Sequence, residues 1–328
     1  MIRFGIIGAG RIGIVHARSV EKNLGAQLVA ISDPVKEARE KLAEQYGATP
    51  VETAEEIFGN PEIDAVIVCS PTPLHVPHIL EGVKAGKYVM CEKPVAMKLE
   101  AAKQLQADLE GFDPKIMIGF NRRFDPSFAK IHQLVEDGEI GPIEQLTVIS
   151  RDPAAPPKEY IAVSGGIFKD MTIHDFDMAR FFLGDITEVS ASGQNLDPEL
   201  ADTGDFDAAV IVLKNAEGKI ATIVNSRHCA PGYDQRLEAF GPEGTLFAEN
   251  IRPTTVRVSK RTHSDALDPY LDFFLERYEA AYSNELDAFI DAIDGKRPFT
   301  PSVDDGVKAL EIAEAASESA RSGKVVEL

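Results

Sequence analysis

Residues 2–13 read IRFGIIGAGRIG. Residues 2–7 are mostly apolar and β-prone, which is typical of a buried parallel strand. The glycines that follow have the spacing G-x-G-x-x-G, and residues 14–23 after them read as a helix. A strand, a glycine turn and a helix in this order indicate a dinucleotide-binding unit, with the pyrophosphate on the free N–H groups of the helix N-terminus. The predicted cofactor contacts from this turn are Gly8, Gly10, Arg11, Ile12 and Gly13.

An acidic residue completes this pattern. The next apolar strand, residues 27–32, is followed directly by Asp33, where this type of unit carries an acidic residue about 20 positions beyond the glycines. A carboxylate there accepts hydrogen bonds from the adenosine ribose and repels a 2′-phosphate. The sequence therefore predicts NAD as the cofactor. Lys36 and Arg39 lie close by in the sequence and keep NADP open as the alternative.

The chain changes texture at about residue 120. Before it, strands alternate with helices, which predicts an α/β Rossmann domain with a doubly wound parallel sheet over residues 1–120. After it, β-rich segments dominate, which predicts an α+β domain over residues 121–328 with a mainly antiparallel, open sheet. The expected strands of this second domain are residues 144–150, 186–194, 207–213, 220–226, 235–241 and a short final strand at 325–327. Its expected helices are residues 121–138, 166–183, 272–293 and 303–322.

Bulk composition bounds the function. The 328 residues exceed what one hydrophobic core supports, and the formal net charge is −19. This acidity argues against nucleic acid or an anionic membrane surface as a partner. The sequence has no membrane-length apolar run and no signal-peptide pattern, so we expect a cytoplasmic protein. The cysteines, Cys69, Cys91 and Cys229, fit neither a disulfide framework nor a zinc-ligand spacing.

Polar residues follow two later strands of the first domain. Ser70, Thr72 and His75 come after the strand at 65–69, and Glu92 and Lys93 follow the strand at 88–91. Ligands of a doubly wound sheet bind beyond the carboxyl ends of its strands. A lysine fixed there can donate to a substrate hydroxyl or alkoxide, although Lys93 alone also fits a solvated surface lysine.

The second domain supplies an acid–imidazole pair. If residues 166–183 form one helix, Asp170 and His174 lie one turn apart on the same face, and Asp177 continues that face. A carboxylate beside an imidazole supports general acid/base chemistry. An ordinary helix turn with a hydrogen-bonded histidine is the structural alternative. A shared metal ion is a further alternative, but no third ligand is apparent locally, and we predict no metal site.

Four ordered motifs resemble those of a known family. These are the turn GAGRIG, the stretch SPTPLH at 70–75, Glu92-Lys93-Pro94, and the Asp170-x-x-x-His174 segment. Together they are similar to the glucose–fructose oxidoreductase/inositol dehydrogenase/rhizopine catabolism (Gfo/Idh/MocA) family over nearly the whole chain. Residues 119–125 and 165–177 look most like its myo-inositol 2-dehydrogenases.

The resemblance implies an NAD-dependent oxidoreductase that converts a ring hydroxyl of a cyclic polyol or sugar to a ketone. It implies a catalytic set of Lys93, Asp170 and His174, with His174 as general base. It also implies that the second domain binds substrate and builds homo-oligomer contacts with its open sheet, as a dimer or tetramer. Residues implied in cofactor binding besides the glycine turn and Asp33 are Ser70, Thr72, His75, Glu92 and Lys93. Residues implied in substrate binding are Arg123, Asp177 and Tyr233.

One segment departs from the family pattern. A histidine expected near the end of the second domain's first strand is not evident, because residues 149–153 read ISRDP. Another inositol isomer or an aldose therefore remains open as the substrate. An NAD-dependent glycosidase on the same fold and a catalytically silent dinucleotide-binding regulator are the alternatives from other functional classes.

Overall fold

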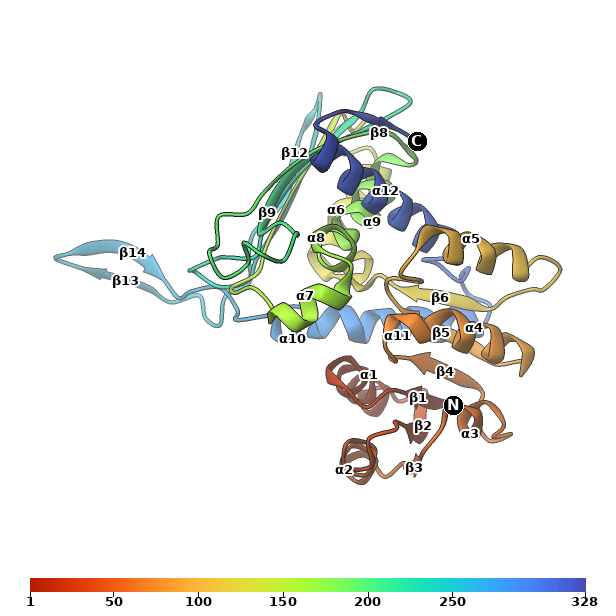
Figure 1. The fold of residues 1–328 in the computed structure, drawn as a ribbon. Helices are drawn as coiled ribbons and strands as arrows, with labels where there is room; N and C mark the ends of the chain where they lie inside the picture. Colours follow the sequence, from red (N-terminus) through yellow and green to blue (C-terminus); the bar gives the residue numbers. More distant parts are fainter. The chain divides into compact units, whose positions relative to one another are not determined.

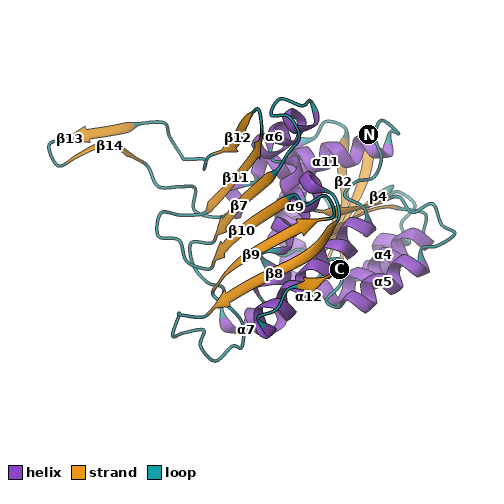
Figure 2. Cartoon of the chain, turned by 90° about the horizontal axis from the view of Figure 1, so that it is seen from above, coloured by secondary structure: helices purple, strands orange, loops and turns teal.

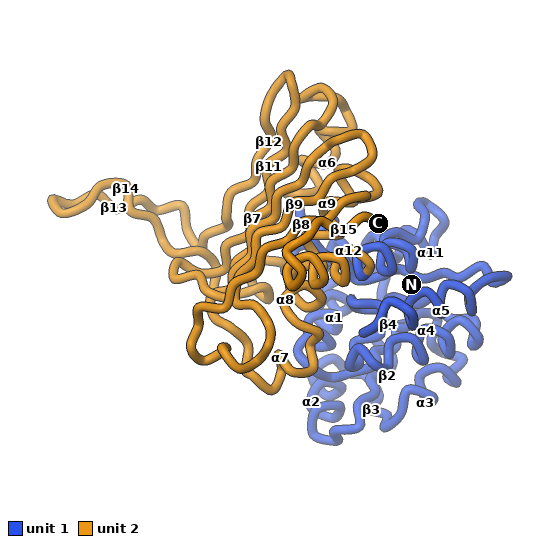
Figure 3. Tube along the Cα trace, turned by 45° about the horizontal axis from the view of Figure 1, so that its top comes forward, with its two compact units in different colours: residues 1–125, 279–310 blue, residues 126–278, 311–328 orange.

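The computed structural model describes residues 1–328, which form two compact units (Figure 3). The first unit comprises residues 1–125 and 279–310, and the second comprises residues 126–278 and 311–328. Neither unit is one continuous stretch, because the chain returns to the first unit after residue 278. The division at residue 120 into a cofactor domain and a substrate domain stays a prediction. None of the helices combines the length and apolar character needed to cross a membrane.

A parallel sheet forms the centre of the first unit. Its strands are β1 (Ile2–Ile7), β2 (Ala26–Ser32), β3 (Thr49–Val51), β4 (Ala65–Val68), β5 (Tyr88–Glu92) and β6 (Ile116–Gly119). They lie in the order β3-β2-β1-β4-β5-β6, and every neighbouring pair is parallel. The strand order reverses between β1 and β4, and ligands of such sheets bind at the carboxyl ends beside that point. The predicted doubly wound Rossmann sheet is confirmed.

Helices connect these strands (Figure 1). They are α1 (Arg11–Lys22), α2 (Lys36–Tyr46), α3 (Ala54–Phe58), α4 (His75–Lys84) and α5 (Leu99–Asp108), with two short 3₁₀ turns, η1 (Thr72–Leu74) and η2 (Asn121–Phe124). Helix α11 (Glu279–Ile293) also belongs to this unit, as does the start of α12 (Val303–Ser322). Strand β3 and helix α3 were not predicted, because each is too short to show a periodic apolar pattern.

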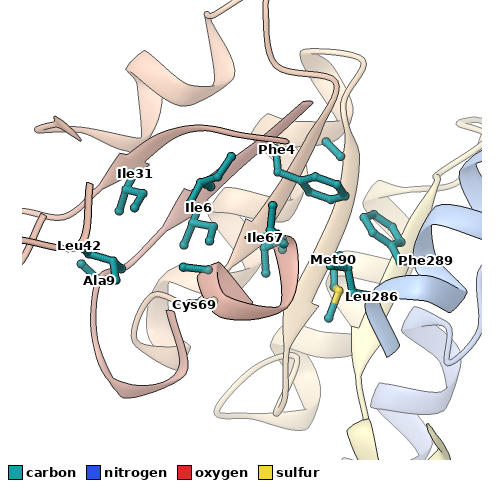
Figure 4. Packing of buried hydrophobic residues seen from close by; sticks show 14 of the residues in the cluster. Phe4, Ile6, Ala9, Ile31, Leu42, Ile67, Cys69, Met90, Leu286 and Phe289 are labelled. Carbon is teal, nitrogen blue, oxygen red and sulfur yellow. The ribbon is translucent and has the colours of Figure 1, made fainter. Parts of the chain in front are cut away.

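The core of the first unit joins the sheet to α11. Phe4 and Ile6 of β1, Ile67 of β4 and Phe289 of α11 are fully buried and belong to one apolar cluster (Figure 4). The rings of Phe4 and Phe289 lie 6.3 Å apart. Burying each such side chain stabilises the fold by about 1.5–3 kcal/mol. Helix α11 is therefore part of the first unit's core although it comes late in the sequence.

The second unit contains a mixed sheet. Its strands are β7 (Gln145–Arg151), β8 (Ile186–Gln194), β9 (Ala208–Asn215), β10 (Ile220–Ser226), β11 (Asp234–Gly241), β12 (Gly244–Ala248) and β15 (Val326–Glu327). Their order is β12-β11-β7-β10-β9-β8-β15. Only β7 and β10 are parallel, and the other neighbours are antiparallel. The prediction of a mainly antiparallel sheet is confirmed.

Helices cover one face of this sheet and leave the other open (Figure 2). The helices of the unit are α6 (Pro126–Glu136), α7 (Lys158–Ser164), α8 (Ile167–Asp170), α9 (Ile173–Leu183) and α10 (Phe274–Arg277), together with the part of α12 from residue 311 onward. Strand β9 shows the two faces clearly, because Ile211 and Leu213 are buried while Val210 and Val212 are exposed. A separate hairpin, β13 (Arg257–Lys260) and β14 (His263–Leu267), extends from the unit with mostly exposed residues (Figure 1).

Three predicted helices are interrupted. The helix expected over 121–138 is divided into η2 and α6, because Asp125 precedes Pro126 and takes an extended conformation (φ −61°, ψ 127°). A residue before proline is sterically disfavoured in the helical region. The helix expected over 272–293 is divided into α10 and α11 at Tyr278, whose φ of −110° and ψ of 16° are not helical.

The third interruption falls inside the expected helix 166–183. Asp170 ends α8 and His174 lies in the first turn of α9, so the two are not on one continuous helix. The backbone N–H of Thr172 donates to the carbonyl of Ile167, five residues back, at 2.9 Å, which breaks the regular ladder. The hydroxyl of Thr172 donates to Asn225 Oδ1 at 2.6 Å and anchors the break to the sheet. The orientations of the Asp170 and His174 side chains are therefore set by two different helices, α8 and α9.

Candidate active site

The glycine turn has the form that a dinucleotide requires. Gly8 has φ of +108°, and a Cβ on it would lie 2.5 Å from the carbonyl oxygen of Cys69. A Cβ on Gly13 would lie 2.0 Å from the carbonyl oxygen of Gly8. Nothing lies within 4 Å of the Cβ position of Gly10, so the backbone is open to a ligand there. Helix α1 begins with no side-chain cap and no acidic residue in its first turn, so its N-terminus can accept an anion.

Asp33 is tied to this turn. Its Oδ2 accepts a hydrogen bond from the backbone N–H of Ala9 at 2.8 Å, and its Oδ1 accepts one from Val35 at 2.8 Å. The guanidinium of Arg39 donates to the carbonyl oxygens of Asp33 and Pro34. The carboxylate is thus held beside the glycines, where it disfavours a 2′-phosphate. These residues fit NAD.

His75 links the turns that follow β4 and β5. It is buried, and its Nδ1 and Nε2 each lie 2.8 Å from a carbonyl oxygen, of Pro94 and Ser70 respectively. Burial lowers the pKa of His75, although the two carbonyls act in the opposite direction. The neighbouring Ser70 hydroxyl contacts His78 Nδ1 at 3.0 Å. Both ring nitrogens of His75 therefore contact backbone carbonyls. Thr72 lies in η1, between Ser70 and His75 in the sequence.

The segment 92–94 stands at the carboxyl end of β5. Glu92 is buried, and its Oε1 lies 2.6 Å from Nε2 of His16 on α1. Lys93 follows at the strand's end, the position predicted for it, and is partly exposed. Arg123, in η2, donates from Nη2 to Asp305 Oδ1 at 3.0 Å. The first unit thus brings the glycine turn, Asp33 and Lys93 to one edge of its sheet.

The second unit holds Asp170 between a hydroxyl donor and a cation. The hydroxyl of Tyr160 donates to Asp170 Oδ1 at 2.9 Å, and Nη1 of Arg227 lies 3.7 Å from Asp170 Oδ2. His174 is half-buried at the start of α9, and Asp177 is fully buried further along that helix. Tyr233 is buried just before β11, edge-on to the rings of Phe273 and Tyr278 at 5.5 and 6.0 Å.

A buried polar network fixes the start of α9. Asp175 accepts hydrogen bonds from Ser150 Oγ on β7 at 2.7 Å and from Asn225 Nδ2 on β10 at 2.8 Å. Because Asp175 neighbours His174, this network fixes the backbone that carries the imidazole. A fully satisfied buried network makes the local structure rigid. Sequence reasoning missed all three residues. Polar residues alternating along a strand, such as Ser150 and Asn225, also fit its exposed face, and an acidic residue in the first turn of a helix, such as Asp175, also fits solvent exposure.

Residues missed in the first unit include His16 and Glu285. Glu285 of α11 is fully buried, and neither carboxyl oxygen has a hydrogen-bond partner. Burial, and then the charge of Glu92, raise the pKa of Glu285 well above its ordinary value. The one signal in the sequence that points to Glu285 is an acidic residue between the apolar positions of an amphipathic helix. In the whole chain, no group of three or more His, Cys, Asp or Glu side chains is arranged to hold a metal ion.

The first unit has a doubly wound parallel sheet, a glycine turn and an acidic residue hydrogen-bonded to that turn. Together with a second unit built on an open sheet, these features define a dinucleotide-binding oxidoreductase. Comparison with known families agrees: residues 2–120 match "Oxidoreductase family, NAD-binding Rossmann fold" and residues 128–247 match "GFO/IDH/MocA C-terminal domain". The chain belongs to the Gfo/Idh/MocA oxidoreductase family, and its cofactor is NAD.

Relatives match over their full lengths. An inositol 2-dehydrogenase of Rhizobium meliloti is 44% identical over 320 residues, covering 97% of this chain and 96% of that protein. The crystal structure of a myo-inositol dehydrogenase from Corynebacterium glutamicum has a TM-score of 0.98 and 49% identity, covering 100% and 99% of the two chains. A scyllo-inositol dehydrogenase from Lactobacillus casei, solved with NAD(H) and scyllo-inositol, has a TM-score of 0.92 and 31% identity, covering 100% and 99%.

Proposed function

We propose that this chain is an NAD-dependent inositol 2-dehydrogenase that oxidises a ring hydroxyl of myo-inositol to a ketone. The observation that carries this proposal is similarity along the whole chain, at 44% and 49% identity, to proteins named inositol 2-dehydrogenase and myo-inositol dehydrogenase. The glycine turn and Asp33 support the cofactor, and Lys93, Asp170 and His174 supply the side chains that the chemistry needs.

The proposed roles follow from the chemistry of each side chain. His174 accepts the proton of the ring hydroxyl as general base. Lys93 donates a hydrogen bond to the same oxygen and stabilises its developing negative charge. Asp170 binds a neighbouring hydroxyl of the substrate, and its charge tunes Lys93 and His174. The bound cofactor would supply the hydride acceptor for the carbon that carries the reacting oxygen. The substrate thus loses one hydride and one proton and becomes a ketone.

Specificity for a polyol requires several polar partners. Arg123, Asp177 and Tyr233 are proposed to bind further hydroxyls. A site that pairs each hydroxyl with a donor or acceptor rejects analogues that leave a buried partner unpaired. Four further residues are proposed to support the cofactor: Ser70, Thr72, His75 and Glu92. His75 would do so through its contacts with backbone carbonyls, and Glu92 through its contact with His16.

A substrate panel tests the proposal. The protein is mixed with NAD and, separately, with myo-, scyllo- and chiro-inositol and with several aldoses, and NADH absorbance is followed. Net NADH with myo-inositol supports the proposal. A higher kcat/KM with another isomer or an aldose would identify that compound as the preferred substrate. Sugar released from an aryl glycoside without net NADH indicates a glycosidase. Absence of both reactions contradicts an enzyme of either kind and favours a dinucleotide-binding regulator.

The open face of the second unit's sheet is proposed to join copies of this chain. Val210, Val212, Ile220, Phe240 and Phe247 are all exposed, and the strand register places them on one face. Exposed apolar patches of this kind mark protein interfaces. Light scattering on the purified protein tests this, with a dimer or tetramer expected. A Phe247→Asp/Val212→Asp variant is expected to shift it toward monomer, and a monomeric wild-type protein would contradict the interface.

A further inference from the structure

Arg227 is the largest fully buried side chain of the molecule and carries no role so far. It follows β10, and its backbone N–H donates to the carbonyl of Asp207 at 2.7 Å. Placing a guanidinium without solvent is costly unless carboxylates compensate it. Two carboxylates of the second unit do so. Nη2 donates to Asp205 Oδ2 at 3.1 Å, and Nη1 lies 3.7 Å from Asp170 Oδ2.

These two carboxylates hold opposite ends of helix α8. At its start, the backbone N–H of Ile167 donates to both oxygens of Asp205, at 3.1 and 3.0 Å. At its end stands Asp170. Gly166 allows the close approach of Asp205, because a Cβ there would lie 2.7 Å from Asp205 Oδ1. One guanidinium therefore spans the helix and contacts the acid at each end.

Asp170 is consequently held from two sides. Tyr160 hydrogen-bonds Oδ1, while Arg227 faces Oδ2 with an N–H group that has no other hydrogen-bond partner. A separation of 3.7 Å is an ion pair rather than a hydrogen bond. Such contacts are often long before substrate binds and shorten in the reactive complex. The Oδ1 atom of Asp170 is thus held by a hydrogen bond from Tyr160, and its Oδ2 atom is attracted by the charge of Arg227.

We propose that Arg227, anchored by Asp205, is a positioning residue that fixes the Asp170 carboxylate for substrate binding and turnover. The inference rests on the proposed function, because it assigns Asp170 to the polyol site. Arg227 itself contacts neither substrate nor cofactor in this proposal. Its effect is exerted entirely through the orientation of Asp170. Small displacements of a positioning group reduce rates by about 100-fold.

Paired variants separate positioning from stability. Arg227→Met leaves Asp205 and Asp170 without their cation, so Tm and kcat/KM for myo-inositol should both fall, the latter by about 100-fold. The double variant Arg227→Met/Asp205→Asn also removes the Asp205 charge that Arg227→Met leaves uncompensated. Its Tm should therefore return toward that of the wild type, while kcat/KM stays low. The affinity for NAD should change little in either variant. Lys214→Met, which removes the cation of a separate ion pair with Glu188 (2.8 Å), is the control and should keep wild-type kcat/KM.

Chemical rescue gives a second readout. Arg227→Ala opens a space for exogenous guanidinium, which should restore part of kcat, whereas Asp170→Asn should not respond to it. The inference is overturned if kcat/KM recovers together with Tm in the double variant, because Arg227 then serves stability alone. If the wild-type protein oxidises no polyol, the proposed function fails separately. Crystal structures of the wild type and the double variant then decide: a reoriented Asp170 carboxylate supports the inference, and an unmoved one contradicts it.

Discussion

Glu285 of the first unit and Arg227 of the second are both ionisable side chains with no exposed surface, yet their neighbours differ. Arg227 has two carboxylates beside it, Asp170 and Asp205. Glu285 has no hydrogen-bond partner on its carboxyl oxygens, and the charge that acts on it is that of another carboxylate, Glu92. The second unit compensates buried charge with opposite charge, whereas the first favours a carboxyl that keeps its proton.

The comparison shows how neighbours decide the state of an acidic side chain. Burial and a nearby negative charge disfavour the ionised form, and a nearby cation favours it. Asp170 has the guanidinium of Arg227 close by and accepts a hydrogen bond from the hydroxyl of Tyr160. Glu285 is close enough to Glu92 for the charge of Glu92 to raise its pKa, and Glu92 itself contacts His16. A protonated Glu285 therefore adds no second negative charge beside Glu92.

The largest expected effect comes from removing the proposed base in the second unit. His174→Ala should lower kcat with myo-inositol by about 100- to 10,000-fold, because a general base contributes that much. NAD affinity should stay near wild type, since the cofactor turn belongs to the first unit. His228→Ala is the matched control, because His228 is 51% exposed and pairs with Asp197. A His174→Ala enzyme that kept most of its rate would refute the assignment.

Breaking the anchor of Arg227 should have the next largest effect. Asp205→Asn leaves the buried guanidinium with one partner, and breaking a buried pair lowers the free energy of unfolding by about 3 kcal/mol. Urea unfolding measures the change. Asp202→Asn is the control. The Asp202 carboxylate is 76% exposed and forms a surface ion pair with Lys158. Removing this pair is expected to lower the free energy of unfolding by less than about 1 kcal/mol. Equal losses in both variants would contradict the distinction.

Glu285 predicts a smaller, pH-dependent effect. Its raised pKa means that the folded protein binds more protons than the unfolded chain above the ordinary glutamate pKa. The free energy of unfolding therefore falls as pH rises from there toward the folded-state pKa, by about 1.4 kcal/mol for each pH unit in that interval. Glu285→Gln should remove this slope, so the variant gains on wild type with rising pH.

The control for this experiment has the opposite sign. Lys22 donates to Glu279 and lowers the pKa of that carboxyl, so Glu279 stabilises the fold above its ordinary pKa and loses this as pH falls. Glu279→Gln should therefore lose slightly at neutral pH. Urea unfolding across pH 5–8 distinguishes the two. An unchanged slope for Glu285→Gln would show that this side chain is not a neutral acid.

The smallest expected effect concerns cofactor choice. Asp33→Asn keeps an acceptor oxygen for the Ala9 N–H but removes the charge that opposes a 2′-phosphate. The ratio of kcat/KM for NADP to that for NAD should rise about tenfold, or about 1.4 kcal/mol. Steady-state rates with both cofactors measure it, with Asp64→Asn as a control on the same unit's surface. An unchanged ratio would remove Asp33 from cofactor selection.

Local patterns predicted most of the fold. The apolar run of β1, the glycine spacing and Asp33 each depend on neighbours in sequence, and the structure has the predicted parallel sheet around them. Strands β8 and β10 end at the residues expected, because apolar and polar side chains alternate along them. Helix α12 likewise matches its expected range of 303–322.

Long-range partners could not be predicted in the same way. Arg227 is an arginine after a strand, and its burial depends on Asp170 and Asp205, which come from distant parts of the chain. The helix break at Thr172 is anchored by a hydrogen bond to Asn225, again remote in sequence. The apolar pattern of residues 166–183 continues across the break, so periodicity alone indicates one helix.

The central claim is that this chain moves a hydride from C2 of myo-inositol to NAD. Incubating the protein with NAD and myo-inositol deuterated at C2 tests it most directly, with mass spectrometry of the NADH formed and of the inositol-derived product. The account predicts one deuterium in the NADH, a ketone at C2 and a slower rate than with unlabelled substrate if hydride transfer limits turnover. NADH without deuterium, or no NADH at all, would contradict it.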